Sequence, residues 1–286
     1  MPELPEVETV VRDLRPLLVG HVLADLRRSK QRLRTEWQPA WRRQLQGRKV
    51  VEVNRRGKWI VIILDDEARL LVHLGMTGQL RVMDAGEPTA DHTHLTVTLD
   101  SGAAELRFRD IRRFGTAIVI QGAGKVDDFF RASGLGPEPF ALAAGYWRER
   151  LADTQRCLKA VLLDQRVVAG VGNIYADESL FEARLAPWQI AAKTSRTEAD
   201  RLRRAVGKVL ERAIEGRGSS IRNYVGGTGL QGSYQREFRV YGCTGRPCQR
   251  CKKPIERIRL VGRSTHYCPR CQKAETAPNL VSPISS

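Results

Sequence analysis

The sequence predicts an α+β protein with more than one domain, and three observations carry this prediction. Residues 22–120 contain short apolar stretches with a period of two, separated by turn residues, which is typical of a β-sandwich or barrel. Residues 142–214 instead carry apolar side chains at intervals of three and four, as helices do. Two closely spaced cysteine pairs follow between residues 248 and 271, which indicates a small C-terminal unit held by a metal ion.

The composition points to a polyanionic partner. The chain of 286 residues has 48 lysines and arginines against 32 aspartates and glutamates, a formal net charge of +16. A membrane surface would also attract this charge, but no apolar run approaches the ~18 residues of a spanning helix, and no signal-peptide pattern is present. We therefore expect a soluble, intracellular protein whose six cysteines are metal ligands or free thiols rather than disulfides.

The first element is expected to be a helix over residues 3–18. A helix that begins at Pro2 would place its positive dipole end under the N-terminus, which disfavours an ammonium group there. One apolar face runs along this helix through Val7, Val10, Val11, Leu14 and Leu18.

Pro2 is a candidate nucleophile if Met1 is removed, as a small second residue normally allows. A terminal amine titrates near ~7.7–8.0, so roughly a tenth is neutral at pH 7 and able to attack an electrophilic carbon. Attack on a sugar C1′ would give a positively charged iminium that acts as an electron sink, with Glu3 and Glu6 as the nearby carboxylates. The same residues also suit an ordinary helix start, since proline and glutamate are both favoured in a first turn.

Eight short strands are expected within the period-two region. Turn signals such as Arg56-Gly57 and Asp100-Ser101-Gly102 separate many of them. Basic residues stand at several strand ends, where they form either a solvated rim or a binding surface. The expected strand ranges are 21–29, 49–54, 59–64, 70–74, 79–83, 95–99, 105–109 and 116–120.

Three loops in this region carry distinctive side chains. Lys58 follows a glycine turn and opens an apolar strand. Met76 lies on a glycine-flanked loop, and Phe114 follows the two arginines Arg112 and Arg113. Methionine and phenylalanine are usually core residues, but on exposed loops they would form wedges able to enter a base stack.

The helical region is expected to begin after a linker over residues 121–140, which is rich in glycine and proline. Residues 170–176, Gly-Val-Gly-Asn-Ile-Tyr-Ala, form a glycine turn that opens a helix and offers backbone N–H groups to a phosphate. Thr197-Glu198-Ala199-Asp200 resembles a capping box at the start of a longer helix. The other expected helices cover 142–153, 157–163 and 176–185.

The cysteine pairs have the spacing of a zinc site. Cys248-x2-Cys251, sixteen residues, then Cys268-x2-Cys271 is typical of four thiolates around one structural Zn2+. Basic residues surround these ligands, which favours a nucleic-acid finger over a plain structural clip. Cys157 and Cys243 are left over as ordinary thiols.

Taken together, the motifs resemble those of the bacterial formamidopyrimidine-DNA glycosylase family, also called the Fpg/Nei family. The resemblance covers roughly residues 1–273 and follows the family's order of motifs. The motifs are Pro2-Glu3-Leu4-Pro5-Glu6-Val7-Glu8-Thr9, Arg56-Gly57-Lys58, His73-Leu74-Gly75-Met76-Thr77-Gly78, Arg112-Arg113-Phe114-Gly115, Leu135-Gly136-Pro137-Glu138-Pro139, residues 170–176 and the four paired cysteines.

The resemblance implies three domains and a disordered tail over 275–286. They are a catalytic β-sandwich led by a helix over residues 1–132, a helix–two-turn–helix DNA-binding domain over 133–225, and a zinc finger over 226–274 that begins with a lid loop. It implies a monomer in the bacterial cytoplasm, associated with the nucleoid, which binds duplex DNA between its halves and holds one zinc ion. The implied activity is excision of oxidised purines such as 8-oxoguanine and formamidopyrimidines, with β,δ-elimination at the abasic site, in base excision repair.

The resemblance assigns catalytic roles residue by residue. Pro2 would be the Schiff-base nucleophile at C1′ and Glu3 the acid/base that assists sugar opening and proton transfer, while Glu6 supports the site. Lys58 would assist β-elimination, and Arg263 would act at δ-elimination.

The resemblance also assigns DNA contacts. The wedge would consist of Met76, Arg112 and Phe114. A family lysine upstream of Lys159 is replaced near Thr154, with Arg156 as a substitute. Other DNA contacts would come from Arg112, Lys159, Asn173 and one or both of His92 and His94. The lid over the flipped base would include Arg222, Tyr224, Gly226 and Thr228.

Two alternatives remain open. An endonuclease VIII-type glycosylase for oxidised pyrimidines would share Pro2, Glu3 and the zinc site. Its members typically begin Pro-Glu-Gly-Pro and lack the wedge, so Leu4, Met76 and Phe114 favour the purine enzyme. A non-catalytic zinc-finger DNA-binding protein would need no N-terminal amine.

Overall fold

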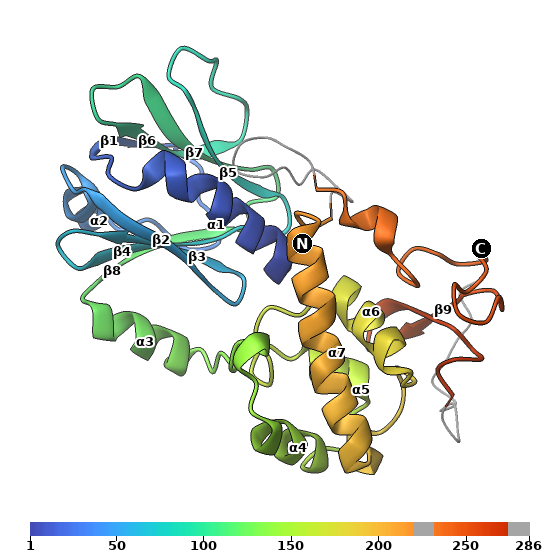
Figure 1. Cartoon of the computed structure of the whole chain (residues 1–286). Helices are drawn as coiled ribbons and strands as arrows, with labels where there is room; N and C mark the ends of the chain where they lie inside the picture. Colours follow the sequence, from blue (N-terminus) through green and yellow to red (C-terminus); the bar gives the residue numbers. More distant parts are fainter. Residues whose placement is uncertain (220–231, 274–286) are drawn as a thin grey trace. The chain divides into compact units, whose positions relative to one another are not determined.

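The computed structural model describes residues 1–219 and 232–273, and the chain divides into two compact units. The first unit comprises residues 1–133 and 214–235, and the second comprises residues 134–213 and 236–286. The first is a β-sandwich, and the second is helical and carries a small β-hairpin (Figure 1). The expected tail over 275–286 lies outside the described residues.

Two four-stranded antiparallel sheets form the first unit, and all eight expected strands are confirmed. Between the sheets lies one apolar core that includes the buried side chains of Val53, Ile60, Leu70 and Phe108. One sheet has the order β1-β6-β7-β5, with β1 Leu23–Arg28, β5 Gly78–Asp84, β6 Thr93–Leu99 and β7 Ala104–Asp110. The other has the order β2-β3-β4-β8, with β2 Val50–Arg56, β3 Trp59–Leu64, β4 Ala68–His73 and β8 Thr116–Gln121.

Helix α1, Leu4–Leu18, packs its apolar face onto strands β2 and β5. The helix was expected to begin at Pro2, but its N-cap is Glu3 and the proline of its first turn is Pro5. The reason is local, because the Glu6 carboxylate accepts a hydrogen bond from the Glu3 backbone N–H at 2.8 Å and fixes the cap there. Pro2 therefore precedes the helix rather than opening it.

Two helices of the first unit were not expected from the sequence: α2, Pro39–Leu45, and α3, Ala123–Ala132. Helix α3 falls in the segment expected to be a linker, where Gly122 is its N-cap and Gly124 lies in its first turn. Its Phe129 and Phe130 rings pack edge-on against Trp59, with centroids 5.5 and 6.2 Å apart. These tertiary contacts, rather than the local sequence pattern, account for the helix.

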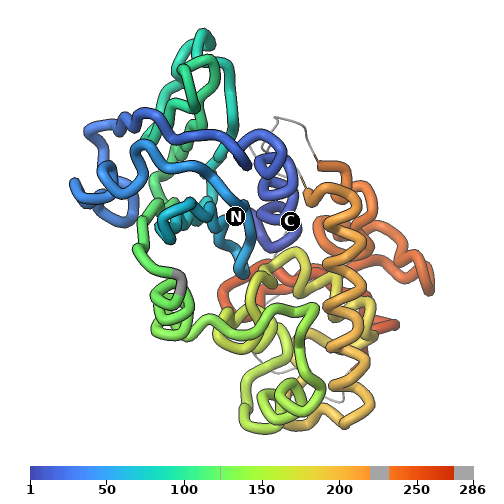
Figure 2. The backbone as a smooth tube through the Cα atoms, turned by 60° about the vertical axis from the view of Figure 1, so that its left-hand side comes forward, coloured from blue at the N-terminus to red at the C-terminus, as the bar shows by residue number. Residues whose placement is uncertain are grey.

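The second unit is built from four α-helices and a hairpin within its described residues. Helices α5 and α6 are joined by the turns of residues 164–172, and α7 is the longest helix (Figure 2). Trp188, Ile258, Leu260 and Tyr267 form an apolar cluster that attaches the hairpin. The elements are α4 Ala144–Ala152, α5 Leu158–Leu163, α6 Asn173–Ala183, α7 Arg196–Glu215, β9 Glu256–Leu260 and β10 Arg263–Tyr267, with 3-10 turns at Pro139–Ala141, Ala191–Lys193 and, at the boundary of the units, Tyr234–Glu237.

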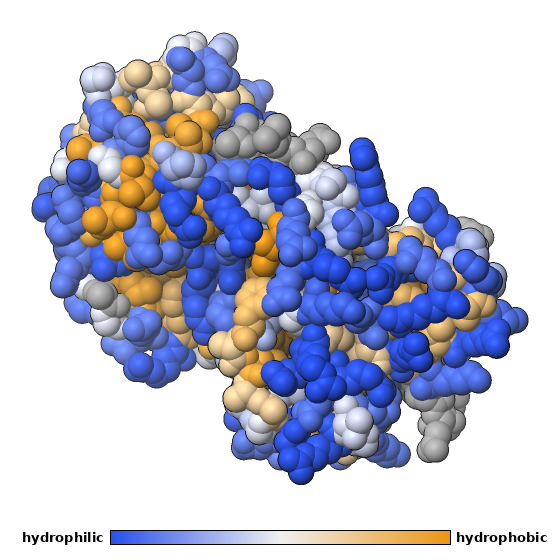
Figure 3. All heavy atoms as spheres, viewed as in Figure 1, coloured by the Kyte–Doolittle hydropathy of each residue, from blue (hydrophilic) through white to orange (hydrophobic). Residues whose placement is uncertain are grey.

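Helix α7 is amphipathic. Its buried face includes Leu202, Val206 and Leu210, whereas hydrophilic side chains cover its outer face (Figure 3). On the polar side, Lys208 forms an ion pair with Glu182 of α6 at 2.7 Å. Across residues 1–219 and 232–273, no helix combines the length and the apolar character needed to cross a membrane.

The capping box of α7 lies two residues before the expected one. Ser195 Oγ accepts a hydrogen bond from the Glu198 N–H at 3.3 Å, and the Glu198 carboxylate accepts one from the Ser195 N–H at 2.9 Å. The predicted box at Thr197 is therefore wrong, because Thr197 already lies within the helix. Glu198 serves as the third helical residue of a Ser-x-x-Glu box.

Removal of the Ser195 hydroxyl should shorten or destabilise α7. We expect Ser195→Ala to lower the free energy of unfolding by about 1 kcal/mol, because loss of the hydroxyl leaves the backbone N–H of Glu198 without its acceptor. Thr197→Ala is the matched control and should change stability by less than about 0.5 kcal/mol. Urea unfolding followed by circular dichroism measures both, and equal losses would contradict the assignment of the cap.

Candidate active site

The N-terminal segment is held by the buried carboxylate of Glu6. Its Oε2 accepts a hydrogen bond from the Glu3 N–H at 2.8 Å, and its Oε1 accepts bonds from the N–H and Oγ of Ser219 at 2.8 and 3.0 Å. Pro2 and Glu3 are buried, whereas Met1 is 54 % exposed. Loss of Met1 would thus uncover a proline that the chain already holds in place.

Lys58 lies in the tight turn between β2 and β3, next to His73 at the end of β4. Burial, together with the positive charges of Lys58 and Arg34, lowers the pKa of His73 to about 4. His73 Nδ1 accepts a hydrogen bond from the Gly75 N–H at 3.1 Å, which also favours the neutral ring. His73 is therefore uncharged at neutral pH, next to the positive charges of Lys58 and Arg34.

A cavity of about 500 Å3 opens beside this group of residues. It brings the N-terminal residue next to the two loops that were expected to form a wedge. Its lining consists of Met1, Arg34, His73, Gly75, Met76, Arg113 and Phe114.

The two wedge loops touch each other through their backbones. Gly75 has φ +61°, and a Cβ atom there would lie 2.6 Å from the backbone N of Gly115 and the backbone C of Phe114. Met76 and Phe114 are 37 % and 46 % exposed, which is unusual for large apolar side chains. The Arg112 guanidinium lies over the Phe114 ring, with Cζ 4.7 Å from the ring centroid.

Asp110 fixes the geometry of both loops, although the sequence pattern did not single it out. Its fully buried carboxylate accepts hydrogen bonds from the Thr77 hydroxyl at 2.5 Å, the Gly115 N–H at 2.7 Å and the Arg112 N–H at 3.3 Å. The signal available in the sequence was an aspartate between the expected strand over 105–109 and the Arg-x-Phe motif. Ser219 was also missed, because it follows a glycine-rich stretch without periodicity.

The two histidines of the His-x-His stretch differ in exposure. His92 is exposed and has a left-handed backbone with φ +64°. His94 is 4 % exposed, and its ring nitrogens lie 3.0 Å from Ser29 Oγ and 2.9 Å from the carbonyl oxygen of Asp110. His94 thus supports the loops, and His92 is the histidine whose ring is open to a ligand.

In the second unit, Asn173 and Arg263 belong to adjoining elements. Asn173 is the first residue of α6, where backbone N–H groups and the helix dipole favour an anion. Its Nδ2 donates a hydrogen bond to the Ser264 carbonyl oxygen at 3.0 Å. Arg263, which directly precedes Ser264, is exposed at the start of β10.

Lys159 does not lie where a direct phosphate contact would require it. Its side chain is fully buried, and its Nζ donates to Asp177 Oδ1 at 2.7 Å, Thr265 Oγ1 at 2.7 Å and the Ser264 carbonyl at 2.9 Å. The expected direct contact with DNA is corrected accordingly. Three oxygen partners compensate the buried charge, so Lys159 ties α5 and α6 to the strand that follows Arg263.

Two further expectations concern Arg156 and the lid residues. Arg156, the suggested substitute near Thr154, forms an ion pair with Asp164 at 2.9 Å. The lid residues Arg222, Tyr224, Gly226 and Thr228 lie outside the described residues.

The four paired cysteines converge as a metal site. Their sulfur atoms all lie within 4.8 Å of one another, with Cys248–Cys271 at 3.9 Å and Cys251–Cys268 at 3.4 Å. Tetrahedral Zn2+ with bonds of about 2.3 Å needs sulfur atoms roughly 3.8 Å apart, so the cluster fits zinc. The four cysteines therefore fit one structural zinc ion.

The β-sandwich with its buried N-terminal proline, the paired helices and the four-cysteine hairpin define a zinc-finger DNA glycosylase. Models of the formamidopyrimidine-DNA glycosylase N-terminal domain, its H2TH domain and the zinc finger found in FPG and IleRS match residues 1–117, 135–225 and 245–274. The chain belongs to the formamidopyrimidine-DNA glycosylase family, whose members act in base excision repair.

Individual relatives match over nearly their whole length. The formamidopyrimidine-DNA glycosylases of Moorella thermoacetica and Carboxydothermus hydrogenoformans are 47 % and 43 % identical, over 91 % and 96 % of this chain and 95 % and 100 % of theirs. The Lactococcus lactis Fpg in complex with DNA containing an abasic site has a TM-score of 0.89 at 34 % identity, covering 95 % of this chain and 100 % of that one. MutM in complex with DNA containing carbocyclic 8-oxo-G has a TM-score of 0.88 at 35 % identity, with 96 % and 100 % covered.

The depressed pKa of His73 predicts a loss of stability in acid. Between pH 6.5 and about 4, His73 is protonated in the unfolded chain but stays neutral in the folded protein. The free energy of unfolding therefore falls as the pH is lowered through this window. His73→Gln should remove this loss, which amounts to up to about 3 kcal/mol. Urea unfolding of both proteins from pH 8 to 4 measures it, and a difference that does not vary with pH would contradict the assignment.

Proposed function

We propose that this protein excises oxidised purines from duplex DNA and then cleaves the strand, with Pro2 as the nucleophile. The observation that carries the proposal is the position of the N-terminus, which lines one cavity together with Met76 and Phe114. A base extruded from the helix leaves a gap that such exposed apolar side chains can fill. Removal of Met1 is part of the proposal, since it frees the secondary amine of Pro2.

The chemistry follows from the amine and the buried acid beside it. The Pro2 nitrogen attacks C1′ as the bond from C1′ to the base breaks, and Glu3 passes protons to the opening sugar. The resulting iminium acidifies the C2′ proton, so its removal expels the 3′ phosphate in β-elimination. Lys58 assists this step, and Arg263 of the second unit grips phosphate and acts at the second elimination.

The remaining assignments concern binding. We assign phosphate contacts to Asn173 at the start of α6 and to His92, the exposed histidine of its pair. Lys159 acts indirectly in this account, by holding the strand that carries Arg263. We assign the lid over the base to Arg222, Tyr224, Gly226 and Thr228.

The proposal extends to organisation and setting. The protein acts as a monomer on damaged duplex DNA at the nucleoid in the cytoplasm of a bacterial cell. Its domains cover residues 1–132, 133–225 and 226–274. Its relatives are named for formamidopyrimidine, and matched structures contain DNA with Fapy-dG or carbocyclic 8-oxo-G, which supports purine damage over the pyrimidine specificity of the endonuclease VIII type.

Borohydride trapping on duplex DNA containing 8-oxoguanine tests the proposed nucleophile. Wild-type protein should give a covalent adduct, Pro2→Gly should lose most of it, and Glu3→Gln should lose base excision while keeping DNA affinity. Mass spectrometry of the protein used checks whether Met1 has been removed. Absence of an adduct with an intact Pro2 terminus would overturn the enzyme in favour of a non-catalytic DNA-binding protein. An adduct that peptide mapping places on a lysine would overturn Pro2 as the nucleophile.

The wedge suggests how the opposite base is chosen. Arg112 stacks on Phe114 at 4.7 Å, so its planar fork of donors has a fixed orientation. Cytosine presents the acceptors O2 and N3 on its pairing edge, whereas adenine presents N1 beside a donor. Arg112 should therefore favour excision opposite cytosine, which avoids fixing a mutation opposite adenine.

Single-turnover excision of 8-oxoguanine opposite cytosine and opposite adenine tests this role. Arg112→Ala should lose the cytosine preference, by about 1–3 kcal/mol if the contact resembles a bidentate base contact. Arg113→Ala is the control, because Arg113 lines the cavity but does not stack on Phe114. Uniform slowing of Arg112→Ala on both duplexes would instead mean a phosphate contact.

A further inference from the structure

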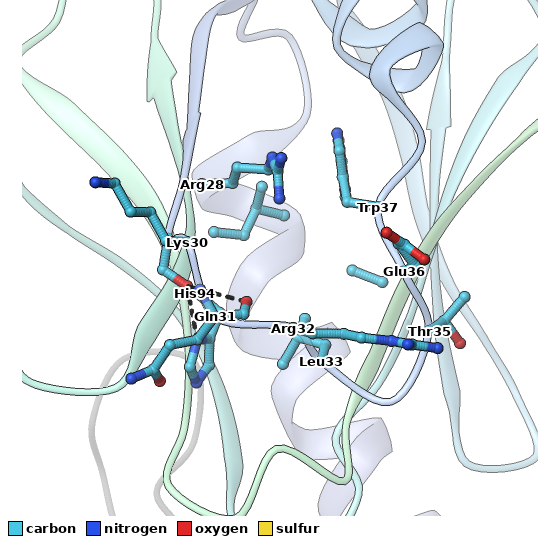
Figure 4. Close-up of a pocket in the computed structure, with 12 residues that line it drawn as sticks. Arg28, Lys30, Gln31, Arg32, Leu33, Thr35, Glu36, Trp37 and His94 are labelled. Carbon is cyan, nitrogen blue, oxygen red and sulfur yellow. Dashed lines mark hydrogen bonds between the residues drawn. The ribbon is translucent and has the colours of Figure 1, made fainter.

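A second hollow lies in the first unit, between β1 and α2, and none of the proposed chemistry uses it. It has a volume of about 240 Å3 and is lined by residues 28–33 and 35–37 together with His94, Leu95 and Ala117 (Figure 4). Neither the N-terminus nor the wedge side chains contribute to its lining. It is therefore separate from the cavity beside Met1.

The hollow is strongly cationic. Residues 27–49 contain nine lysines and arginines against one acidic residue, Glu36. Arg28, Lys30 and Arg32 all line the hollow, and among the described residues none of these three forms an ion pair. Neighbouring cations differ, because Arg27 pairs with Glu105 and Arg42 with Asp25. Uncompensated charges gathered in a concave site attract an anion more strongly than charges spread over a surface do.

The hollow also offers a fixed aromatic ring. Trp37 lines it and lines a neighbouring hollow of about 430 Å3, and Arg28 likewise borders both. Trp41 packs edge-on against Trp37, with ring centroids 5.2 Å apart, and both rings pack against the core of the sandwich. Figure 4 shows Arg28 and Trp37 facing each other across the hollow, with Arg32 running along one side of it.

We propose that this Trp37 hollow is a second nucleic-acid subsite, which binds an unpaired nucleotide. The base lies against Trp37, and the phosphodiester lies between Arg28 and Arg32. Aromatic rings beside a cationic track are the usual means of holding single strands, since every base has a face that can stack. The base must be unpaired, because both faces of a base within a duplex are already stacked. The proposal rests on DNA as the partner but not on the reaction assigned to Pro2.

An acidic protein segment is the competing occupant, and the lining favours the nucleotide. A carboxylate-rich segment would satisfy the arginines but would leave Trp37 without a stacking partner. It would also bring many charges close to the Glu36 carboxylate on the rim. A phosphodiester brings a single charge for each stacked base, which suits two arginines beside one aromatic ring.

The test keeps the main DNA site occupied. The full chain is first saturated with an unlabelled duplex that contains a tetrahydrofuran abasic analogue. A labelled oligothymidylate of about ten nucleotides is then titrated by fluorescence anisotropy at increasing salt. We expect Trp37→Leu to weaken binding roughly 5- to 100-fold and Trp37→Phe to retain most of it, because phenylalanine still stacks. Arg28→Gln and Arg32→Gln should each reduce the log–log salt slope by about 0.7.

Matched controls separate the subsite from general electrostatics. Arg43→Gln removes the same charge from an exposed position on α2 that lines neither hollow, and it should change the slope much less. Equal effects of Arg43→Gln and Arg28→Gln, or no effect of Trp37→Leu, would overturn the subsite. Competition by polyglutamate as effective as that by oligothymidylate would overturn it in favour of an acidic partner. Borohydride trapping by Trp37→Leu should stay at the wild-type level, and failure of trapping in the wild type would count against the Pro2 reaction alone.

Discussion

The buried carboxylate of Glu6 is the constraint on which the N-terminal site depends. A carboxylate with 2 % exposure is stable only if its oxygens are compensated, and three donors from Glu3 and Ser219 do so. Those donors come from the N-terminus and from the segment after α7, which are more than two hundred residues apart in the chain. One side chain therefore fixes the backbone directly after Pro2 and links the segment after α7 to the first compact unit.

The same principle organises the wedge and the strand of Arg263. The Asp110 carboxylate accepts hydrogen bonds from Thr77 and Gly115, which lie on two different loops. The Asp177 carboxylate accepts hydrogen bonds from Lys159 Nζ and from the His266 N–H at 2.9 Å. In each case a buried acid in a regular element holds an irregular segment from which exposed side chains project. The exposed groups make few contacts of their own, so their orientation is set by these buried carboxylates.

The sequence predicted those elements whose signal lies within a few neighbouring residues. The eight strands followed from period-two alternation, and the metal site followed from cysteine spacing, because both signals lie within short windows. Helix α3 was missed since Trp59 stabilises it from a distant strand, and the cap at Ser195 was misplaced because Thr197 offers a similar pattern two residues later. The burial of Lys159 could not be foreseen, because its three partners lie on α6 and β10.

Backbone hydrogen bonds join the residues that flank the segment between Ser219 and Gly232. The Tyr234 N–H donates to the Gly218 carbonyl at 3.1 Å, the Ser233 N–H donates to the Gly216 carbonyl at 3.0 Å, and a Cβ atom on Gly232 would lie 2.3 Å from the Gly218 oxygen. Closing a loop whose ends are already joined costs only about 0.6 kcal/mol for each doubling of its length. The intervening residues can therefore vary in length and composition during evolution at little cost to folding.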